Sequence, residues 1–267
     1  MPETALTERS ARVAAAVKLQ RPVGRRRAHR FLAEGPNLVF AAAERGLVRE
    51  VFASEDAAAR HDGVLSGLRA PVHLVTPRAA KALSDTVTPA GLVAVCDLPA
   101  PDLGVVLDGA PELMAVAVDI GEPGNAGTLI RIADAMGAAA VVLAGNSVDP
   151  YNGKCLRASA GSIFAVPVVV AADTPGVLGR LRAAGLRLLA TTVDGEVALD
   201  DAGPLLTGPA AWLFGPESHG LPAGIAGAAD HRVRIPMAGG AESLNVAAAA
   251  AICLYESARA IRNSPRA

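Results

Sequence analysis

Apolar runs alternate with polar, glycine-containing turns along most of the chain. In the second half, short continuous apolar runs predict strands covered on both faces, and the segments between them have the spacing of helices. The predicted strands are 113–118, 139–143, 166–170, 186–192, 212–214 and 233–235. The predicted helices are 128–136, 154–163, 177–184 and 243–262. Repeated strand–helix–strand units predict an α/β domain with a mostly parallel sheet over 111–267.

The first part of the chain shows the same alternation in shorter elements. Its predicted strands are 29–34, 48–53, 72–75 and 92–96. Its predicted helices are 4–19, 36–46, 55–61 and 77–85. Residues 99–110 contain two prolines and several Gly and Asp residues without a sustained period, which is typical of a linker. We therefore expect a small α/β domain over 1–98, a linker over 99–110 and a second domain over 111–267.

Composition limits the classes of function. The net charge is −1 and aromatic residues make up 3% of the chain, so neither a globally basic surface nor an RNA-binding sheet with stacking rings is indicated. Cys96, Cys155 and Cys253 have neither metal-ligand spacing nor a paired framework. This favours a reduced, cytoplasmic protein with structural cysteines and no metal site. No apolar run is long and uninterrupted enough to span a bilayer.

One segment, from Arg21 to Arg30, is strongly basic. Clustered guanidinium groups match phosphate oxygens and release counterions, so the segment is a candidate RNA-binding site. The candidate RNA-binding residues are Arg25, Arg26, Arg27 and Arg30. A solvated surface segment is the alternative interpretation.

Three glycine-rich loops follow predicted strands of the second domain, at 121–131, 214–220 and 235–245. Ligands bind outside the carboxyl ends of strands in open α/β sheets, so these loops form the candidate ligand site. The first loop has neither the glycine spacing of a dinucleotide fingerprint nor the Gly-Lys-Ser/Thr of a P-loop, which argues against a nucleotide-dependent oxidoreductase.

The third loop leads into an alanine-rich helix, because Ala and Leu are strong helix formers. Ser243 can serve as its N-cap, whereas Asn245 at the second helical position is poorly explained by helix propensity. A polar cluster at such a helix start is typical of a ligand site. A capped core helix after a flexible loop is the alternative.

The three loops carry recognisable motifs. They are Asn125-Ala-Gly127-Thr-Leu-Ile-Arg131, Phe214-Gly-Pro-Glu-Ser-His-Gly-Leu221, and Ile235-Pro-Met followed by Ser243-Leu-Asn-Val246. In this order they resemble the signature motifs of the SpoU/TrmH family, RNA ribose 2′-O-methyltransferases of the SPOUT class, over residues 111–262. Residues 1–98, with Phe31-Leu-Ala-Glu-Gly35, resemble the substrate-binding domain of many members. The whole chain resembles the two-domain rRNA enzymes, including the thiostrepton-resistance type.

The resemblance implies a SPOUT α/β fold with a trefoil knot, whose crossing loops at 214–220 and 235–245 wrap the cofactor S-adenosylmethionine. It also implies RNA as the partner, and a homodimer in which the last helix packs across the interface. The residues that match cofactor positions are Thr191, Phe214, Gly215, Ile235, Met237, Ser243 and Leu244. For Ile235 and Leu244, ordinary core packing is an alternative that can hold at the same time.

The resemblance also implies a catalytic set, which consists of Asn125, Arg131, Glu217, Ser243 and Asn245. A base role has been proposed for the family's motif arginine, but a guanidinium scarcely loses its proton in proteins. We therefore expect Arg131 to clamp the phosphate beside the target ribose. Glu217 can orient Asn125, Arg131 or a water. Alternatively, its negative charge interacts favourably with the dipole at a helix N-terminus. An exposed loop residue is the simpler interpretation of His219.

The resemblance thus implies methyl transfer from S-adenosylmethionine to a ribose 2′-hydroxyl of RNA. 23S rRNA is the expected substrate and tRNA is the alternative. A non-catalytic RNA-binding protein of the same fold is the rival from another class. The presence of all the Asn, Arg, Glu, Ser and Asn motif positions argues against that rival.

Overall fold

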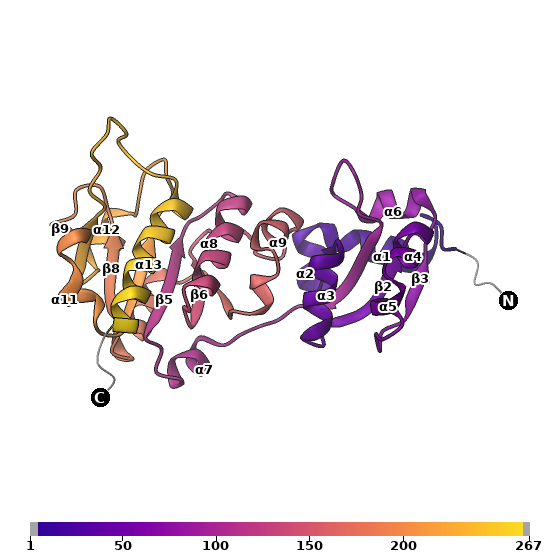
Figure 1. Ribbon diagram of the computed structural model, residues 1–267, viewed down its shortest axis with the longest axis horizontal. Coiled ribbons are helices and arrows are strands. Elements are labelled where there is room, and N and C mark those ends of the chain that lie inside the picture. Colours follow the sequence, from indigo (N-terminus) through magenta and orange to yellow (C-terminus); the bar gives the residue numbers. More distant parts are fainter. Residues whose placement is uncertain (1–4, 264–267) are drawn as a thin grey trace. The chain divides into compact units, whose positions relative to one another are not determined.

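Residues 5–263 are described in the computed structural model, and contacts divide the chain into two units (Figure 1). The first unit comprises the chain up to Pro99 together with Tyr151–Phe164. The second comprises Ala100–Pro150 and the chain from Ala165 onward. Among the described residues, no helix has both the length and the apolar character needed to cross a bilayer.

The first unit is built on a four-stranded sheet in the order β1-β4-β2-β3. Its strands are β1 (Arg30–Glu34), β2 (Val48–Ala53), β3 (Val72–Leu74) and β4 (Leu92–Asp97). β4 pairs antiparallel with β1 and β2, whereas β2 and β3 are parallel. Its helices before the last strand are α1 (Ala11–Val17), η1 (Lys18–Gln20), α2 (Pro22–Ala28), α3 (Pro36–Glu44), α4 (Glu55–Arg60), α5 (Asp62–Leu65) and α6 (Pro77–Leu83). Val13, Phe52 and Leu83 lie in the core between helices and sheet.

The single helix expected over 4–19 is shorter in the structure and is followed by another. Thr4 lies outside the described residues, and the N–H of Thr7 donates to Ser10 Oγ (3.0 Å) in a turn before α1. Pro22 lies in the first turn of α2, where its missing N–H costs no hydrogen bond. Most of the basic segment therefore forms a helix of its own, and its last residue, Arg30, begins β1.

A segment from the middle of the chain completes the first unit. α9 (Gly153–Ser159) and η2 (Ser162–Phe164) belong to this unit. The ring of Phe31 on β1 contacts the rings of Tyr151 and Phe164, at centroid distances of 5.0 and 5.9 Å. The sequence analysis placed this segment in a continuous second domain over 111–267. The structure differs because these aromatic side chains pack on β1.

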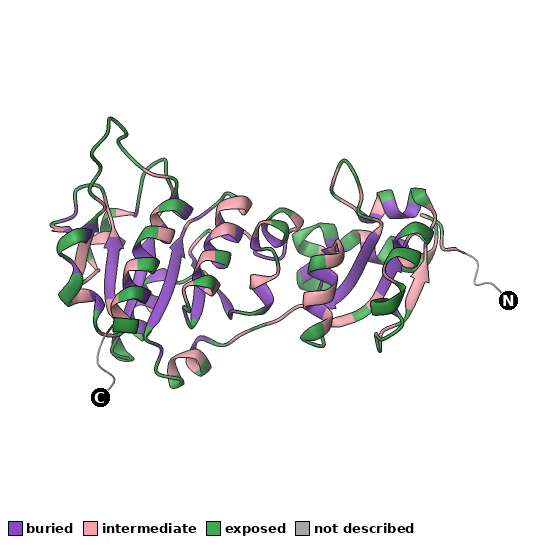
Figure 2. Cartoon of the chain, in the orientation of Figure 1, coloured by how far each residue is buried: buried purple, intermediate pink, exposed green. Residues whose placement is uncertain are grey.

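The second unit contains a seven-stranded sheet in the order β7-β6-β5-β10-β8-β11-β9, with parallel pairing between all neighbours. The strands are β5 (Leu113–Val118), β6 (Ala140–Ala144), β7 (Val168–Ala171), β8 (Arg187–Thr191), β9 (Val197–Ala198), β10 (Ala210–Phe214) and β11 (His231–Arg234). β5, β6 and β10 are buried along their whole length (Figure 2). This confirms the α/β fold with a mostly parallel sheet, whose central strands are covered on both faces.

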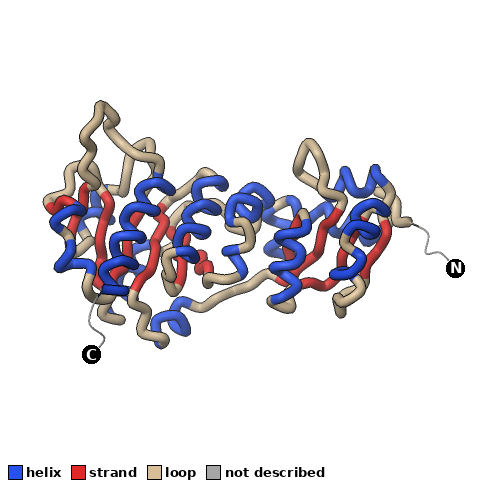
Figure 3. Tube along the Cα trace, in the orientation of Figure 1, coloured by secondary structure: helices blue, strands red, loops and turns tan. Residues whose placement is uncertain are grey.

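Helices cover both faces of this sheet (Figure 3). They are α7 (Leu103–Asp108), α8 (Pro123–Ala135), α10 (Thr174–Ala183), η3 (Leu199–Asp201), α11 (Gly203–Leu206), α12 (Ala223–Gly227) and α13 (Val246–Asn263). α13 packs against α8 and β10, and the fully buried Trp212 donates from Nε1 to Ser257 Oγ at 2.8 Å. Consecutive strand side chains point to opposite faces, so Leu213 faces the other core, which contains Leu178 and Leu181 of α10.

The expected linker over 99–110 is partly helical. Asp102 caps α7, because its Oδ1 accepts from the N–H groups of Gly104 (2.6 Å) and Val105 (3.2 Å). Leu103 is 3% exposed and belongs to the core of the second unit. A helix of this length is too short to produce a sustained apolar period, which is why the sequence pattern missed it. The short elements β9, α11 and α12 were missed for the same reason.

Candidate active site

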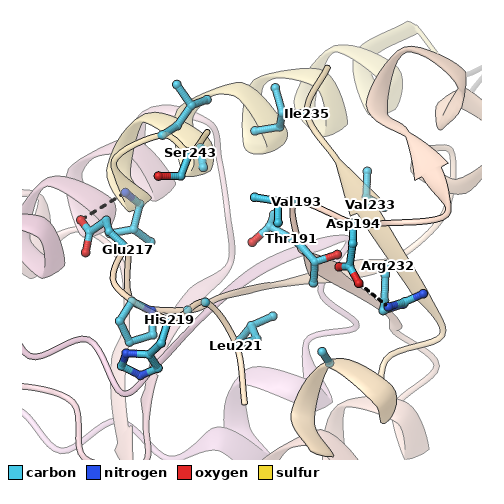
Figure 4. Close-up of a pocket in the computed structure, with 18 of the residues that line it drawn as sticks. Thr191, Val193, Asp194, Glu217, His219, Leu221, Arg232, Val233, Ile235 and Ser243 are labelled. Atoms are coloured by element: carbon cyan, nitrogen blue, oxygen red, sulfur yellow. Dashed lines mark hydrogen bonds and ion pairs between the residues drawn. The ribbon is translucent and has the colours of Figure 1, made fainter. Parts of the chain in front are cut away.

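A cavity of about 850 Å³ opens at the carboxyl edge of the second sheet (Figure 4). Its walls come from the loops after β8, β10 and β11 and from the first turn of α13. Parallel strands end at the same edge, which is where open α/β sheets bind ligands. The expected cofactor residues that line the cavity are Thr191, Gly215, Ile235, Met237, Ser243 and Leu244. The side chain of Phe214 instead lies in the core, where its ring stacks on Trp212 at 6.3 Å.

Two loops near the cavity approach other backbone so closely that they need glycine. A Cβ on Gly215 would lie 2.4 Å from the nitrogen of Leu221, and one on Gly195 would lie 2.6 Å from the nitrogen of Arg234. Any side chain at these positions would force the loops apart. Gly215 therefore lets the loop after β10 close on itself, and Gly195 lets the loop after β8 pack against β11. The loops at 214–220 and 235–245, where the resemblance places the knot crossing, both line the cavity.

Three of the expected catalytic side chains form one hydrogen-bonded group, which we call the Asn–Glu–Asn network: Asn125, Glu217 and Asn245. Glu217 Oε1 accepts from Asn125 Nδ2 at 2.5 Å and from Asn245 Nδ2 at 3.0 Å. Asn245 Nδ2 also donates to Asn125 Oδ1 at 3.1 Å. A carboxylate can only accept, so Glu217 fixes the direction of both amides. The network therefore brings the three sequence motifs together.

Asn245, rather than Ser243, is the N-cap of the last helix. Its Oδ1 accepts from the N–H groups of Ala247 (2.9 Å) and Ala248 (3.4 Å). The N–H of Val246 donates to Glu217 Oε1 at 3.3 Å. This corrects the expectation that the helix begins at Ser243. Asparagine is poorly suited to a helix interior but favoured at the N-cap, so the N-cap position accounts for the asparagine at 245.

Arg131 lies further along α8 than Asn125 and is exposed. Among residues 5–263, no side chain or carbonyl bonds to its guanidinium, so the structure leaves it outside the Asn–Glu–Asn network. The second motif also contributes Ser218 and His219, which line the cavity and share a hydrogen bond between Oγ and Nδ1 at 2.8 Å. His219 is exposed, in keeping with the simpler interpretation.

The loop after β8 adds polar residues that the sequence analysis did not single out. Thr192, Val193 and Asp194 of this loop line the cavity, as does Arg232 on the neighbouring strand β11. Arg232 donates from Nε to Glu196 Oε2 at 3.0 Å and from its second nitrogen, Nη1, to Asp194 Oδ2 at 3.2 Å. The backbone N–H of Arg232 donates to Glu196 and lowers the pKa of that carboxyl. This loop directly follows the predicted strand 186–192, so the strand-end rule could have found it.

The lining of the cavity fits an adenosyl cofactor. Leu221, Ile235 and Leu244 supply apolar surface for an aromatic base. The hydroxyl of Thr192 is buried and has no hydrogen-bond partner among the described residues, whereas that of Thr191 donates to the carbonyl of Leu213 at 2.9 Å. A buried hydroxyl without a hydrogen-bond partner destabilises the protein, so a polar ligand group that bonds to it would remove this free-energy penalty.

The basic segment of the first unit is not uniformly exposed. Arg25 is 2% exposed, and its Nη1 donates to the carbonyls of Leu19 (3.0 Å) and Gln20 (2.9 Å). Arg25 thus satisfies carbonyls at the end of η1, which corrects its assignment as an RNA-binding residue. The other candidate residues are exposed: Arg26, Arg27 and Arg30.

The covered parallel sheet, the glycine loops and the Asn–Glu–Asn network are the features that the resemblance to the SPOUT class of methyltransferases led us to expect. Residues 112–255 match the model of the SpoU rRNA Methylase family, and residues 10–94 match that of the MRM3-like substrate binding domain. The chain belongs to the SpoU rRNA methylase family.

Individual relatives agree with this membership. The chain is 35% identical over 243 residues to the 23S rRNA (guanosine(2553)-2′-O)-methyltransferase RlmP of Bacillus subtilis, covering 89% of this chain and 92% of that protein. It is also similar to the crystal structure of the SpoU methyltransferase AviRb from Streptomyces viridochromogenes in complex with AdoMet. The TM-score is 0.83 and the sequence identity 32%, and the match covers 94% of this chain and 98% of that one. A structure concerned with 2-OH methylation of C/U34 on tRNA covers 58% of this chain and 100% of that one, with a TM-score of 0.52 and 29% identity. The chain is an S-adenosylmethionine-dependent RNA ribose 2′-O-methyltransferase.

Proposed function

We propose that this enzyme methylates a ribose 2′-hydroxyl of 23S rRNA. The observation that carries the choice of substrate is the extent of the likeness to RlmP, which includes both units and 92% of the relative's length. The structure concerned with tRNA corresponds to 58% of this chain. A substrate-binding unit ahead of the catalytic unit favours a large folded RNA over tRNA.

The free hydrogen-bonding capacity of the Asn–Glu–Asn network supports a different role for each member. Asn245 is saturated, since both hydrogens of Nδ2 are donated within the network and both lone pairs of Oδ1 accept helix N–H groups. Asn125 keeps one N–H and one lone pair beyond its bonds to Glu217 and Asn245. Asn125 therefore contacts the ribose, and Glu217 and Asn245 are positioning residues.

Bound S-adenosylmethionine supplies a methyl group activated by a positively charged sulfur. The protein must align the ribose hydroxyl with that methyl group and help remove the hydroxyl proton. Asn125 orients the hydroxyl, and Ser243 lines the cavity together with Glu217, to which Asn125 is hydrogen-bonded. Arg131 holds the neighbouring phosphate, because its guanidinium is exposed, permanently charged and not engaged within the described chain.

The first unit supplies further contacts to RNA. Arg26 and Arg27 are exposed on α2, and Arg30 is exposed on β1 with Asp97 3.9 Å from its Nε. We propose that they bind phosphates of the substrate. We also propose a homodimer in which α13 packs across the interface; the support is the family resemblance and the exposure of Ile252 and Tyr255 on that helix. A cytoplasmic location follows from an rRNA substrate and belongs to the same proposal.

Methylation of separate RNAs tests the function. The purified enzyme is incubated with labelled S-adenosylmethionine and with transcripts of 23S rRNA, 16S rRNA or total tRNA, and the modified ribose is mapped by its resistance to alkaline cleavage. We expect one position in 23S rRNA to be modified. Modification of tRNA alone would show that tRNA, and not 23S rRNA, is the substrate. RNA binding without methyl transfer would favour the non-catalytic alternative.

A further inference from the structure

Three carboxylates line the cofactor cavity, and their contacts differ. Glu217 is engaged by the two amides and a helix N–H through Oε1. Glu242 is exposed, and no group among residues 5–263 orients it. Asp194 is held on one side only, because Oδ2 accepts from Arg232 Nη1 at 3.2 Å. Its side chain is 72% exposed, so the rest of the carboxylate remains accessible.

The Asp194–Arg232 pair is not needed to anchor the loop after β8. The N–H of Thr192 donates to the carbonyl of Val233 at 3.1 Å, and Arg234 donates to the carbonyl of Gly195 at 2.7 Å. Glu196 accepts from both the backbone N–H and Nε of Arg232. An exposed ion pair adds little to such a set of contacts. Arg232 therefore orients Asp194 without depending on it for its own position.

Asp194 lies on the wall opposite the reaction centre. Figure 4 shows Asp194 and Arg232 on one side of the cavity and Glu217 and Ser243 on the other. In the binding mode that we consider, the reactive sulfur of the cofactor faces the Asn–Glu–Asn network and the adenosyl part reaches toward the opposite wall. The groups of that part that donate to a carboxylate are the two ribose hydroxyls and the amino group of adenine.

We propose that Asp194, oriented by Arg232, is a specificity-determining residue that accepts hydrogen bonds from the ribose hydroxyls of the cofactor. In dinucleotide-binding sheets of another strand order, a carboxylate also recognises ribose hydroxyls, so the chemical match has a precedent. Two vicinal donors fit a carboxylate with accessible lone pairs. The proposal rests on the cofactor assignment and names the protein group that recognises its sugar.

Calorimetric binding of ligand analogues to the whole protein tests the proposal. The probes are S-adenosylhomocysteine, its 2′-deoxy and 3′-deoxy analogues, and 5′-methylthioadenosine, which keeps the ribose but lacks the amino acid. Asp194→Ala should weaken S-adenosylhomocysteine and methylthioadenosine by roughly tenfold, the scale of a charged hydrogen bond in a partly open site. The same substitution should weaken each deoxy analogue by a smaller factor than it weakens S-adenosylhomocysteine, because each analogue lacks one of the two donors.

A matched control is Asp200→Ala, which removes an exposed carboxylate of η3 that does not line the cavity. It should leave all four affinities unchanged. The unliganded Asp194→Ala protein should keep the melting temperature of the wild type, because the loop has other anchors. An equal loss of affinity for all ligands would overturn the proposal. Loss for S-adenosylhomocysteine but not for methylthioadenosine would also overturn it, by assigning Asp194 to the amino-acid part. Failure of the wild type to bind S-adenosylhomocysteine would instead contradict the cofactor assignment.

Discussion

Replacement of Glu217 by glutamine or by alanine separates two roles that this carboxylate can have in catalysis. Glutamine keeps an oxygen that can accept from Asn125, Asn245 and the N–H of Val246, but it removes the negative charge. Alanine removes the acceptor altogether. If Glu217 positions the two amides, the glutamine variant should keep much of its turnover. If Glu217 takes the proton of the ribose hydroxyl, both variants should be almost inactive.

The contacts of Glu217 set the expected size of these effects. Its Oε1 accepts at 2.5, 3.0 and 3.3 Å from the three donors. Because the side chain is exposed, each bond is worth about 1 kcal/mol, near the low end for a charged acceptor. A neutral acceptor keeps roughly half of that. We therefore expect turnover to fall about tenfold in Glu217→Gln and about a hundredfold in Glu217→Ala, at 1.36 kcal/mol per factor of ten.

Single-turnover transfer of labelled methyl groups at saturating RNA is the assay, and it is run across neutral pH for the wild type and both variants. Melting temperatures of the unliganded proteins check that each variant is folded. A glutamine variant as slow as the alanine variant would refute the positioning role, because both would then lack what catalysis needs. A tenfold gap between the two would support it.

Four further outcomes are expected. Arg131→Lys should lower turnover or RNA affinity at every pH by roughly 1–3 kcal/mol, whereas a base would give a shifted pH–rate profile with intact affinity. Joint replacement of Arg26 and Arg27 by alanine should weaken RNA binding and flatten its salt dependence, measured by titration at several salt concentrations, with cofactor affinity unchanged. Thr192→Val should weaken S-adenosylhomocysteine in calorimetry without lowering the melting temperature of the unliganded protein, since it removes a buried hydroxyl without a protein partner. Burial raises the pKa of Cys96 from 9.0 to about 12. The neutral thiol therefore contributes fully to the stability of the folded protein below pH 9.0, and this contribution is lost as the pH rises toward 12. A thiol reagent at pH 8 should react with Cys96 only after denaturation.

The parallel sheet was predictable because its central strands, β5, β6 and β10, are short, fully buried and therefore continuously apolar. The first strand, 113–118, has the same bounds in sequence and structure, and the glycine loops were recognisable by their position after strands. The hydrogen bonds between these loops could be found only in the structure. A sequence pattern cannot show that Glu217 bonds to two asparagines from distant motifs, since those contacts depend on where the loops meet.

The two corrected polar residues share a physical cause. Asn245 and Arg25 were assigned from residue type, one as an unexplained helical asparagine and the other as part of a basic cluster. In the structure, each satisfies backbone groups at a helix end, Asn245 through the N–H groups of α13 and Arg25 through the carbonyls of η1. Helix ends leave such groups unpaired, and which polar neighbour pairs with them depends on helix boundaries that are uncertain by a few residues in sequence.

The segment 151–164 shows the limit of dividing this chain by its linker. Its apolar pattern fits the second domain by sequence position, but Tyr151 and Phe164 contact Phe31 of β1. Aromatic residues are only 3% of the chain, so this cluster uses a large part of the available ring surface for the first unit. The chain therefore passes between the units after Pro99, after Pro150 and after Phe164. The first unit is completed by residues that follow the Asn125 motif in the sequence, so a fragment cut at residue 99 would lack part of the core of that unit.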